Sequence, residues 1–192
     1  MVAKDVRIKP VKYLNSSSWA LPELQEADRL GILKSVDGTN FSSRIIRKDF
    51  CALVVDMCES SLGKEMPVSA VNPFKDVKDE AGMNYDSILK AYDAGIISGT
   101  GAARFDPSLP ISREQMAAMM YRASRFLKPG LSYGKGISFS DSKEFNSWSV
   151  DAIKAMSAFG IVKGTNGAYQ PREYVTVEQA CAMVLRLFKK IR

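Results

Sequence analysis

The sequence predicts an all-α protein made of three helix–loop–helix units. Three short stretches that begin with glycine lie 64 and 65 residues apart, namely Gly31-Ile-Leu33, Gly95-Ile-Ile97 and Gly160-Ile-Val162. Apolar residues around them recur at helical spacing, and no segment shows the alternation of a half-buried strand. One helix pair of this size cannot bury its apolar faces alone. The three units are therefore expected to pack together, as a closed bundle or as an open stack.

The composition excludes several classes of function before any motif is considered. The 192 residues are 46% hydrophobic and 25% charged, as in ordinary globular proteins, and the net charge of +6 favours an anionic partner. The basic residues form no run, so nucleic acid is not expected, and no apolar stretch is long enough for membrane insertion. The absence of histidine excludes Ser-His-Asp and Cys-His catalysis and removes the commonest zinc ligand. We therefore expect no enzyme, no metal and no cofactor.

The first unit is assigned to residues 1–63. An irregular lead-in runs to Ser18, and a helical pattern then begins at Trp19 and stops at Gly31. After a loop, a second helix is expected with Arg47 in its first turn.

The second unit, residues 64–128, shows the pattern most clearly. It opens with Phe74-Lys-Asp76, and its first helix stops at Gly95. Ser112-Arg-Glu-Gln115 has the spacing of a capping box, which predicts a second helix with the arginine in its first turn.

The third unit, residues 129–192, repeats this order after a linker rich in glycine and serine. Phe139-Ser-Asp141 opens it, its first helix stops at Gly160, and Thr176-Val-Glu-Gln179 is a second capping box.

Aligned on their glycines, the units match at three informative positions: Trp19, Met83 and Trp148; Arg47, Arg113 and Val177; Cys51, Ala117 and Cys181. The helices that follow the arginine position are the most apolar, so they are expected at the centre.

Taken together, these motifs resemble the S-layer homology (SLH) domain in its triplet form. The resemblance spans about residues 19 to 192. It rests on Phe-x-Asp at 74–76 and 139–141, the aromatic Trp148, Gly-Ile-Ile-x-Gly at 95–99, Phe-x-Pro at 105–107 and Ile-Ser-Arg-Glu-Gln at 111–115. It implies one pseudo-threefold bundle around a central three-helix core. It also implies non-catalytic anchoring of a bacterial surface protein to acidic, pyruvylated secondary cell-wall polysaccharide, bound in grooves between repeats.

The resemblance and the side-chain chemistry together predict the binding residues. The family's motif arginine corresponds to Arg113 and Arg47, and a guanidinium binds a carboxylate bidentately. Free N–H groups at the helix starts are expected to add donors. The full predicted ligand-binding set is Arg113, Arg47, Trp19, Trp148, Gly95, Gly99, Asp76 and Asp141, in which the two aspartates are expected to brace the repeat.

Departures from the family pattern leave an alternative open. Val177 stands where the other two units have arginine, so at most two grooves are predicted to bind. The alternative is a degenerate scaffold that serves protein–protein interaction or assembly without glycan binding. The expected location is extracellular, at the cell wall, although Met1–Asp5 lacks the apolar core of a signal peptide.

Overall fold

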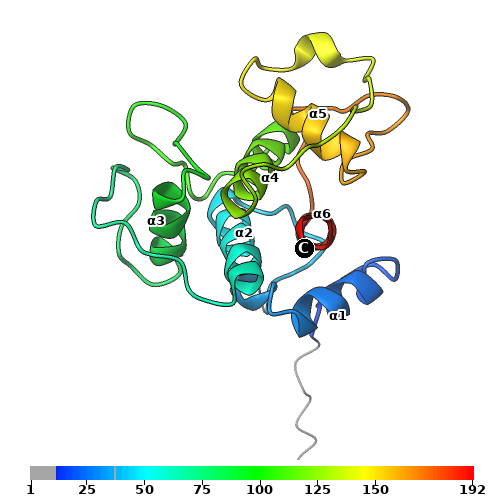
Figure 1. Cartoon of the computed structure of the whole chain (residues 1–192). Coiled ribbons are helices and arrows are strands. Elements are labelled where there is room, and N and C mark those ends of the chain that lie inside the picture. The colour runs from blue at the N-terminus through cyan, green and yellow to red at the C-terminus, as the bar shows by residue number, and fades with distance from the viewer. Residues whose placement is uncertain (1–11, 37) are drawn as a thin grey trace, which may run out of the picture.

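The computed structural model describes residues 12–36 and 38–192, and it confirms the all-α class for them (Figure 1). The helices are α1 (Leu21–Arg29), α2 (Arg47–Leu62), α3 (Tyr85–Asp93), α4 (Arg113–Leu127), α5 (Val150–Ala158) and α6 (Val177–Ile191), with short 3₁₀ turns η1 (Lys34–Val36) and η2 (Ser142–Glu144). Extended pairing in these ranges is limited to isolated bridges. Most of the predicted lead-in, residues 1–11, lies outside the described residues.

The helices begin and end where local chemistry predicts. At the starts of α4 and α6, Ser112 and Thr176 form the two predicted capping boxes with the residues three positions later. Ile46, at the start of α2, has no side chain that can do this. Gly31, Gly95 and Gly160 follow the three short helices in the left-handed conformation, with φ of 72°, 67° and 71°.

The three long helices, α2, α4 and α6, form the centre of the molecule, where each contacts the other two. Cys51, Ala117 and Cys181, which the repeat alignment places at one position, are all fully buried there. Both cysteines are free thiols.

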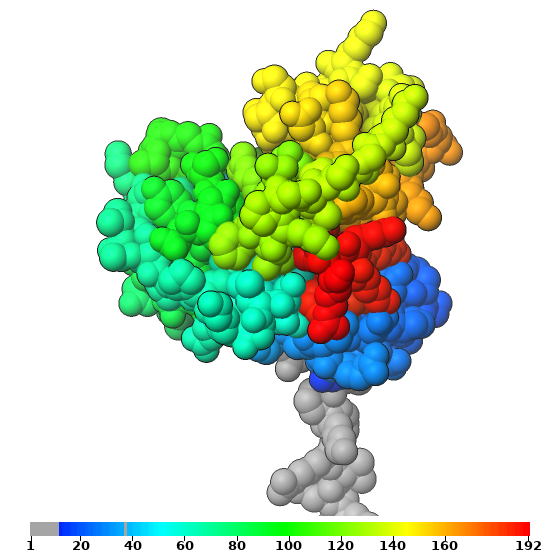
Figure 2. Space-filling model, in the orientation of Figure 1, coloured from blue at the N-terminus to red at the C-terminus, as the bar shows by residue number. Residues whose placement is uncertain are grey.

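Each short helix packs mainly on the long helix of the preceding unit. Helix α3 contacts α2, α5 contacts α4, and α1 contacts α6 (Figure 1). The last of these contacts joins the beginning of the described chain to its end. In Figure 2 the end of α6 is surrounded by residues of the first unit and of α4.

Backbone hydrogen bonds connect the long helices in a cycle. The first two amides of each long helix donate to carbonyls in the loop of another unit: Arg47 to Leu109 and Lys48 to Pro107, Arg113 to Glu173 and Glu114 to Pro171, Val177 to Ser43 and Glu178 to Phe41. All six N···O distances lie between 2.9 and 3.0 Å. The expectation that these amides are free to bind a ligand is therefore wrong, because the neighbouring loop already satisfies them.

Candidate functional site

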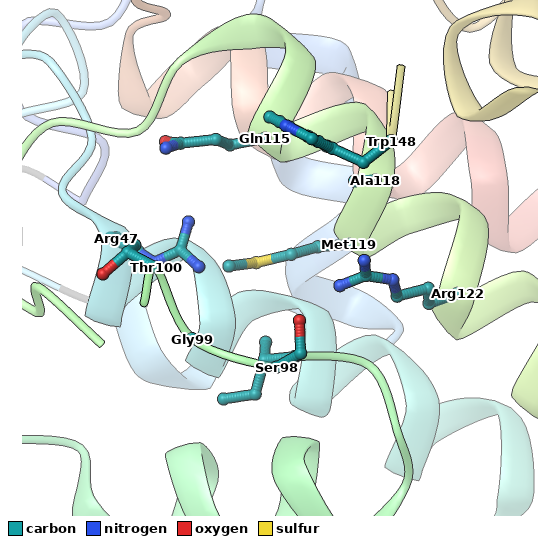
Figure 3. Close-up of a pocket in the computed structure, with 10 residues that line it drawn as sticks. Arg47, Ser98, Gly99, Thr100, Gln115, Ala118, Met119, Arg122 and Trp148 are labelled. Atoms are coloured by element: carbon teal, nitrogen blue, oxygen red, sulfur yellow. The ribbon is translucent and has the colours of Figure 1, made fainter. Parts of the chain in front are cut away.

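A pocket of about 320 Å³ lies where parts of all three units meet (Figure 3). We call it the Arg47 pocket. It is lined by Arg47 of α2, the loop Ile97, Ser98, Gly99 and Thr100, the α4 residues Gln115, Ala118, Met119 and Arg122, and Trp148 just before α5. Its volume is within the range of small-molecule sites in proteins.

Arg47 is buried although it is a cation in the first turn of a helix. Its side chain is only 7% exposed, and its guanidinium carbon lies 4.9 Å from the centre of the Phe105 ring. Its Nε has no hydrogen-bond partner among the described residues. Burial lowers the pKa of Arg47, an effect opposed by Cys51 and Asp106, but an arginine remains charged in proteins. The pocket therefore contains a buried positive charge with an unused donor.

A second cation, Arg122, faces the same space. It extends from α4 and lies across Met119 from Arg47 in Figure 3. One of its terminal nitrogens is 3.5 Å from the carbonyl oxygen of Ile96, and no ion pair joins it to a carboxylate in the described part of the chain. None of the ten lining residues is Asp or Glu. The lining is thus cationic.

The loop wall of the pocket requires glycine. Gly99 has a φ of +85°, and a Cβ there would lie 2.6 Å from the carbonyl oxygen of Arg104 and 3.0 Å from a ring carbon of Phe74. The neighbouring Thr100 donates its N–H to the same carbonyl at 2.8 Å. A side chain at Gly99 would therefore displace the wall, whereas Gly95 has open space around its Cα and only ends a helix.

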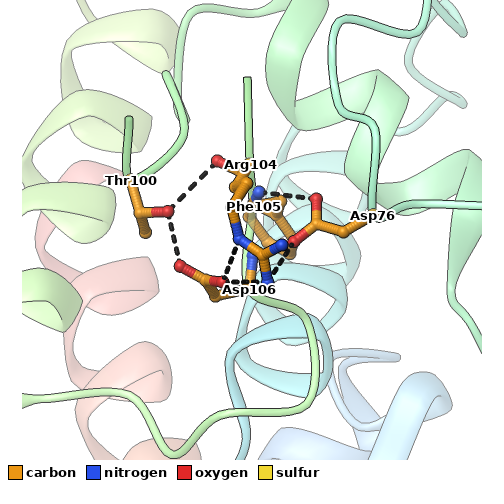
Figure 4. A network of polar contacts seen from close by, with 5 residues as sticks. All are labelled: Asp76, Thr100, Arg104, Phe105 and Asp106. Atoms are coloured by element: carbon orange, nitrogen blue, oxygen red, sulfur yellow. Dashed lines mark hydrogen bonds and ion pairs between the residues drawn. The ribbon is translucent and has the colours of Figure 1, made fainter. Parts of the chain in front are cut away.

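Asp76 and Asp141 support loops, as predicted, and do not line the pocket. Asp76 accepts hydrogen bonds from the backbone amides of Phe105 and Asp106, both at 2.9 Å, and Arg104 adds an ion pair at 3.5 Å (Figure 4). Asp141 accepts the corresponding bonds from Tyr169 and Gln170 at 2.9 and 2.7 Å. Each aspartate thereby fixes the aromatic residue on which a motif arginine rests.

Trp148 offers an aromatic face at the mouth of the pocket. It is 49% exposed, and Glu114 holds the turn around it by accepting hydrogen bonds from the Asn146 side chain at 2.7 Å and from Ser149 Oγ at 3.0 Å. Trp148 is therefore presented on a fixed turn rather than on a free one.

The predicted set divides between two places. Arg47, Gly99 and Trp148 line the pocket, whereas Arg113 and Trp19 lie at the equivalent positions one unit further on. Arg113 donates its Nε to the carbonyl of Tyr169 at 2.8 Å, so this donor is already used. Sequence reasoning missed Gln115, Met119 and Arg122. The available signal was the recurrence of arginine at Arg122 and Arg186, 64 residues apart.

Comparison with known proteins gives one family. Residues 73–117 and 138–181 match the S-layer homology domain. The chain is 30% identical over 186 residues to an endoglucanase from Bacillus sp. (strain KSM-635), which covers 95% of this chain and 19% of that protein. It is 28% identical to an uncharacterized cell wall amidase from Bacillus anthracis, over 87% of this chain and 30% of that protein.

A third relative is the surface-layer 125 kDa protein of Lysinibacillus sphaericus, which is 26% identical over 65% of this chain and 10% of its own length. The chain spans less than a third of each of these relatives. The shared part is therefore a module of larger proteins with different names. Two segments of this helical chain therefore belong to the S-layer homology domain family.

Proposed function

We propose that the chain binds an acidic cell-wall polysaccharide in the Arg47 pocket and does so without catalysis. The observation that carries this proposal is the buried guanidinium of Arg47, whose Nε is unpaired among the described residues. A buried donor without a partner costs about 1–3 kcal/mol, and more if it is charged. A ligand carboxylate in the pocket would compensate the guanidinium by charge-assisted hydrogen bonds.

The remaining lining favours a sugar that carries both an acid and an apolar group. Trp148 and Met119 provide apolar surface, and Gln115 provides an amide for a hydroxyl. A pyruvate ketal has a carboxylate and a methyl group on its ketal carbon, which bridges two oxygen atoms of a sugar, and so it fits cationic and apolar walls together. A terminal pyruvylated sugar is accordingly the proposed ligand.

Two further observations support anchoring rather than catalysis. The ten lining residues include no carboxylate, whereas glycoside hydrolysis ordinarily uses a pair of them. Two of the relatives are named for the cell wall or the surface layer, and the enzymes among them contain this module as a minor part of their length. The proposed location is therefore the outer cell surface.

The test is binding to purified wall polysaccharide before and after chemical removal of pyruvate. Arg47→Ala is expected to reduce affinity about 100-fold, because truncating one partner of a buried charge pair costs several kcal/mol. The matched control is Arg44→Ala, since Arg44 is exposed and rests on Tyr174, outside the pocket. Unchanged affinity in Arg47→Ala would refute the site. Equal binding to the pyruvate-free polymer would refute the ligand, and no binding by the folded wild type would favour the scaffold alternative.

A further inference from the structure

One asparagine of the chain differs from the others in the residue that follows it. Asparagine occurs at positions 15, 40, 72, 84, 146 and 166, and only Asn166 is followed by glycine. An asparagine side chain loses ammonia when the backbone nitrogen of the next residue attacks its Cγ atom. Glycine hinders that attack least, because it has no Cβ beside the attacking nitrogen. Asn166 is therefore the asparagine best suited to this reaction.

Both reacting groups are exposed and take part in no other contact. Asn166 and Gly167 lie at the surface of the loop before α6. Within the ranges that the structure describes, the Asn166 side chain makes no hydrogen bond and the amide of Gly167 donates none. Asn146 provides the contrast, because its side-chain nitrogen donates to Glu114 at 2.7 Å. The two atoms that must join at Asn166 are thus not held apart by other partners.

Asn166 and Gly167 form the tip of a tight hairpin turn. Their φ angles are +50° and +80°, and positive values at both central residues are typical of the type I′ turn, which favours this dipeptide. Thr165 donates its N–H to the carbonyl of Ala168 at 2.8 Å, and Ala168 donates back at 2.9 Å. Ring closure requires the peptide group to rotate out of this arrangement. The folded turn therefore slows the reaction relative to an unfolded chain, but it leaves both atoms accessible.

The same turn holds the start of the third unit. The amide of Ser140 donates to the carbonyl of Gly167 at 2.9 Å, and the Ser140 hydroxyl donates to it at 3.2 Å. The second unit has an equivalent bond, from the amide of Lys75 to the carbonyl of Ala103, also at 2.9 Å. Its turn, residues 100–104, contains no asparagine. Both units therefore use this contact, but only the third places it next to a reactive side chain.

We propose that Asn166 is a site of spontaneous isoaspartate formation, which releases the start of the third unit. The nitrogen of Gly167 loses its proton and bonds to Cγ of Asn166, the bond from Cγ to Nδ2 breaks, and ammonia leaves a succinimide ring. Water then opens the ring at either of its carbonyl carbons, so that one water is gained for one ammonia lost. In the isoaspartate product the main chain runs through Cβ and Cγ and is one atom longer. The turn then no longer pairs Thr165 with Ala168.

The first measurement locates the modification. Folded protein is kept at mildly alkaline pH in water enriched in heavy oxygen, and its peptides are compared over time by mass spectrometry. We expect the Asn166 peptide to exchange its side-chain nitrogen for one labelled oxygen well before the peptides of Asn84 and Asn146, with isoaspartate exceeding aspartate. A reaction at Asn166 that is no faster than at those two overturns the site. Aspartate without isoaspartate overturns the ring, because direct hydrolysis of the amide gives aspartate alone.

Two variants test the parts of the reaction. Gly167→Ala places a methyl group beside the attacking nitrogen, and Asn166→Gln requires a larger ring that closes more slowly. Each should slow the release of ammonia from this position several-fold. Asn166→Gln keeps the glycine and its positive φ, so it decides the question if Gly167→Ala disturbs the turn. Release of ammonia at the wild-type rate in folded Asn166→Gln overturns the proposed attack.

The second measurement follows the backbone. The isoaspartate form has one more negative charge and is separated from unmodified protein by ion exchange. Amide hydrogen exchange of both is compared with that of fresh Asn166→Asp, which has the added charge without the longer chain. We expect the amide of Ser140 to exchange faster in the isoaspartate form only, while that of Lys75 stays unchanged in all three. Unchanged exchange at Ser140 overturns the release, and equally fast exchange in Asn166→Asp overturns chain lengthening as its cause.

Discussion

At the scale of single residues, the two glycines of the central loop have different roles. Gly99 lacks room for a Cβ, whereas Gly95 has room and only a left-handed φ. We expect Gly95→Ala to destabilise the fold by about 1 kcal/mol and Gly99→Ala by about 2–3 kcal/mol, since the latter adds a backbone clash to the strain. Urea unfolding of both variants measures the difference. Equal costs would contradict the role of Gly99 in shaping the pocket wall.

A second prediction concerns the pH dependence of the Asp141 loop brace. Burial opposes ionisation of Asp141, but hydrogen bonds from the Tyr169 and Gln170 amides outweigh it and lower its pKa below the ordinary 3.8. Folding therefore favours the ionised form. This contribution is complete above pH 3.8 and is lost as the pH falls through the lowered value.

Asp141→Asn should accordingly destabilise the protein at pH 7, because an amide NH₂ then faces one of the two backbone donors. The difference from wild type should shrink at an acidic pH below the lowered pKa of Asp141, where the wild-type carboxyl is protonated as well. Denaturant unfolding at both pH values provides the measurement, with exposed Asp93→Asn as the control. A difference that is the same at both pH values would show that charge is not what braces the loop.

The sequence predicted residue types at the site better than it predicted their environments. Repetition identified both Arg47 and Arg113, with Arg113 as the leading candidate, because both occupy the first turn of a long helix. Burial and hydrogen bonding separate them, since only Arg47 lies in the pocket with its Nε unpaired, while that of Arg113 binds a carbonyl. These differences depend on residues 50 or more positions away in the chain, which spacing along one helix does not reveal.

At the scale of elements, Glu178 couples the last helix to the first. It is 5% exposed and accepts hydrogen bonds from the amide and the hydroxyl of Ser17, at 2.7 and 2.9 Å, just before α1. Glu178→Ala should cost about 2–3 kcal/mol, as for lost hydrogen bonds to a charged group. Hydrogen exchange should accelerate in α1 and remain slow in α3, which packs on α2 instead. Uniform acceleration in both helices would contradict this local coupling.

Helix starts and stops followed from the sequence, but helix partners did not. The capping residues Ser112 and Thr176 and the glycine stops depend on neighbours three or four residues away, so local chemistry determines them. The packing of each short helix on the preceding long helix depends on tertiary contacts. The unit boundaries at residues 63/64 and 128/129 stay a prediction, and the structure shows that α3 and α5 pack across them.

At the scale of the whole molecule, the cycle of interunit contacts predicts one cooperative unfolding transition. Trp19 and Trp148 are the two tryptophans of the chain and report on the first and third units. Trp19→Phe and Trp148→Phe variants should show fluorescence midpoints in urea that coincide with the loss of helical circular dichroism. Separate midpoints for the two probes would indicate units that unfold independently.

The all-α fold class could be predicted from the sequence, because one helix–loop–helix pattern, weak in each copy, occurs three times. The arrangement of the pocket was not, because it combines residues from α2, from the loop before α4, from α4 itself and from the turn before α5. No single unit contains more than part of it. Repetition therefore predicts the number of candidate sites, whereas the structure of each interunit boundary determines its charge.

The contact between α1 and α6 has a consequence for chain connectivity. Because α1 and α6 pack together, the last unit contacts the first as well as the second. The position of the chain termini therefore decides only which unit comes first in the sequence. A circular permutant that starts at exposed Val68, with a flexible linker joining residues 192 and 12, should keep the same helices and the Arg47 pocket. Such a permutant would show whether ligand binding in the Arg47 pocket depends on where the chain enters and leaves the folded module.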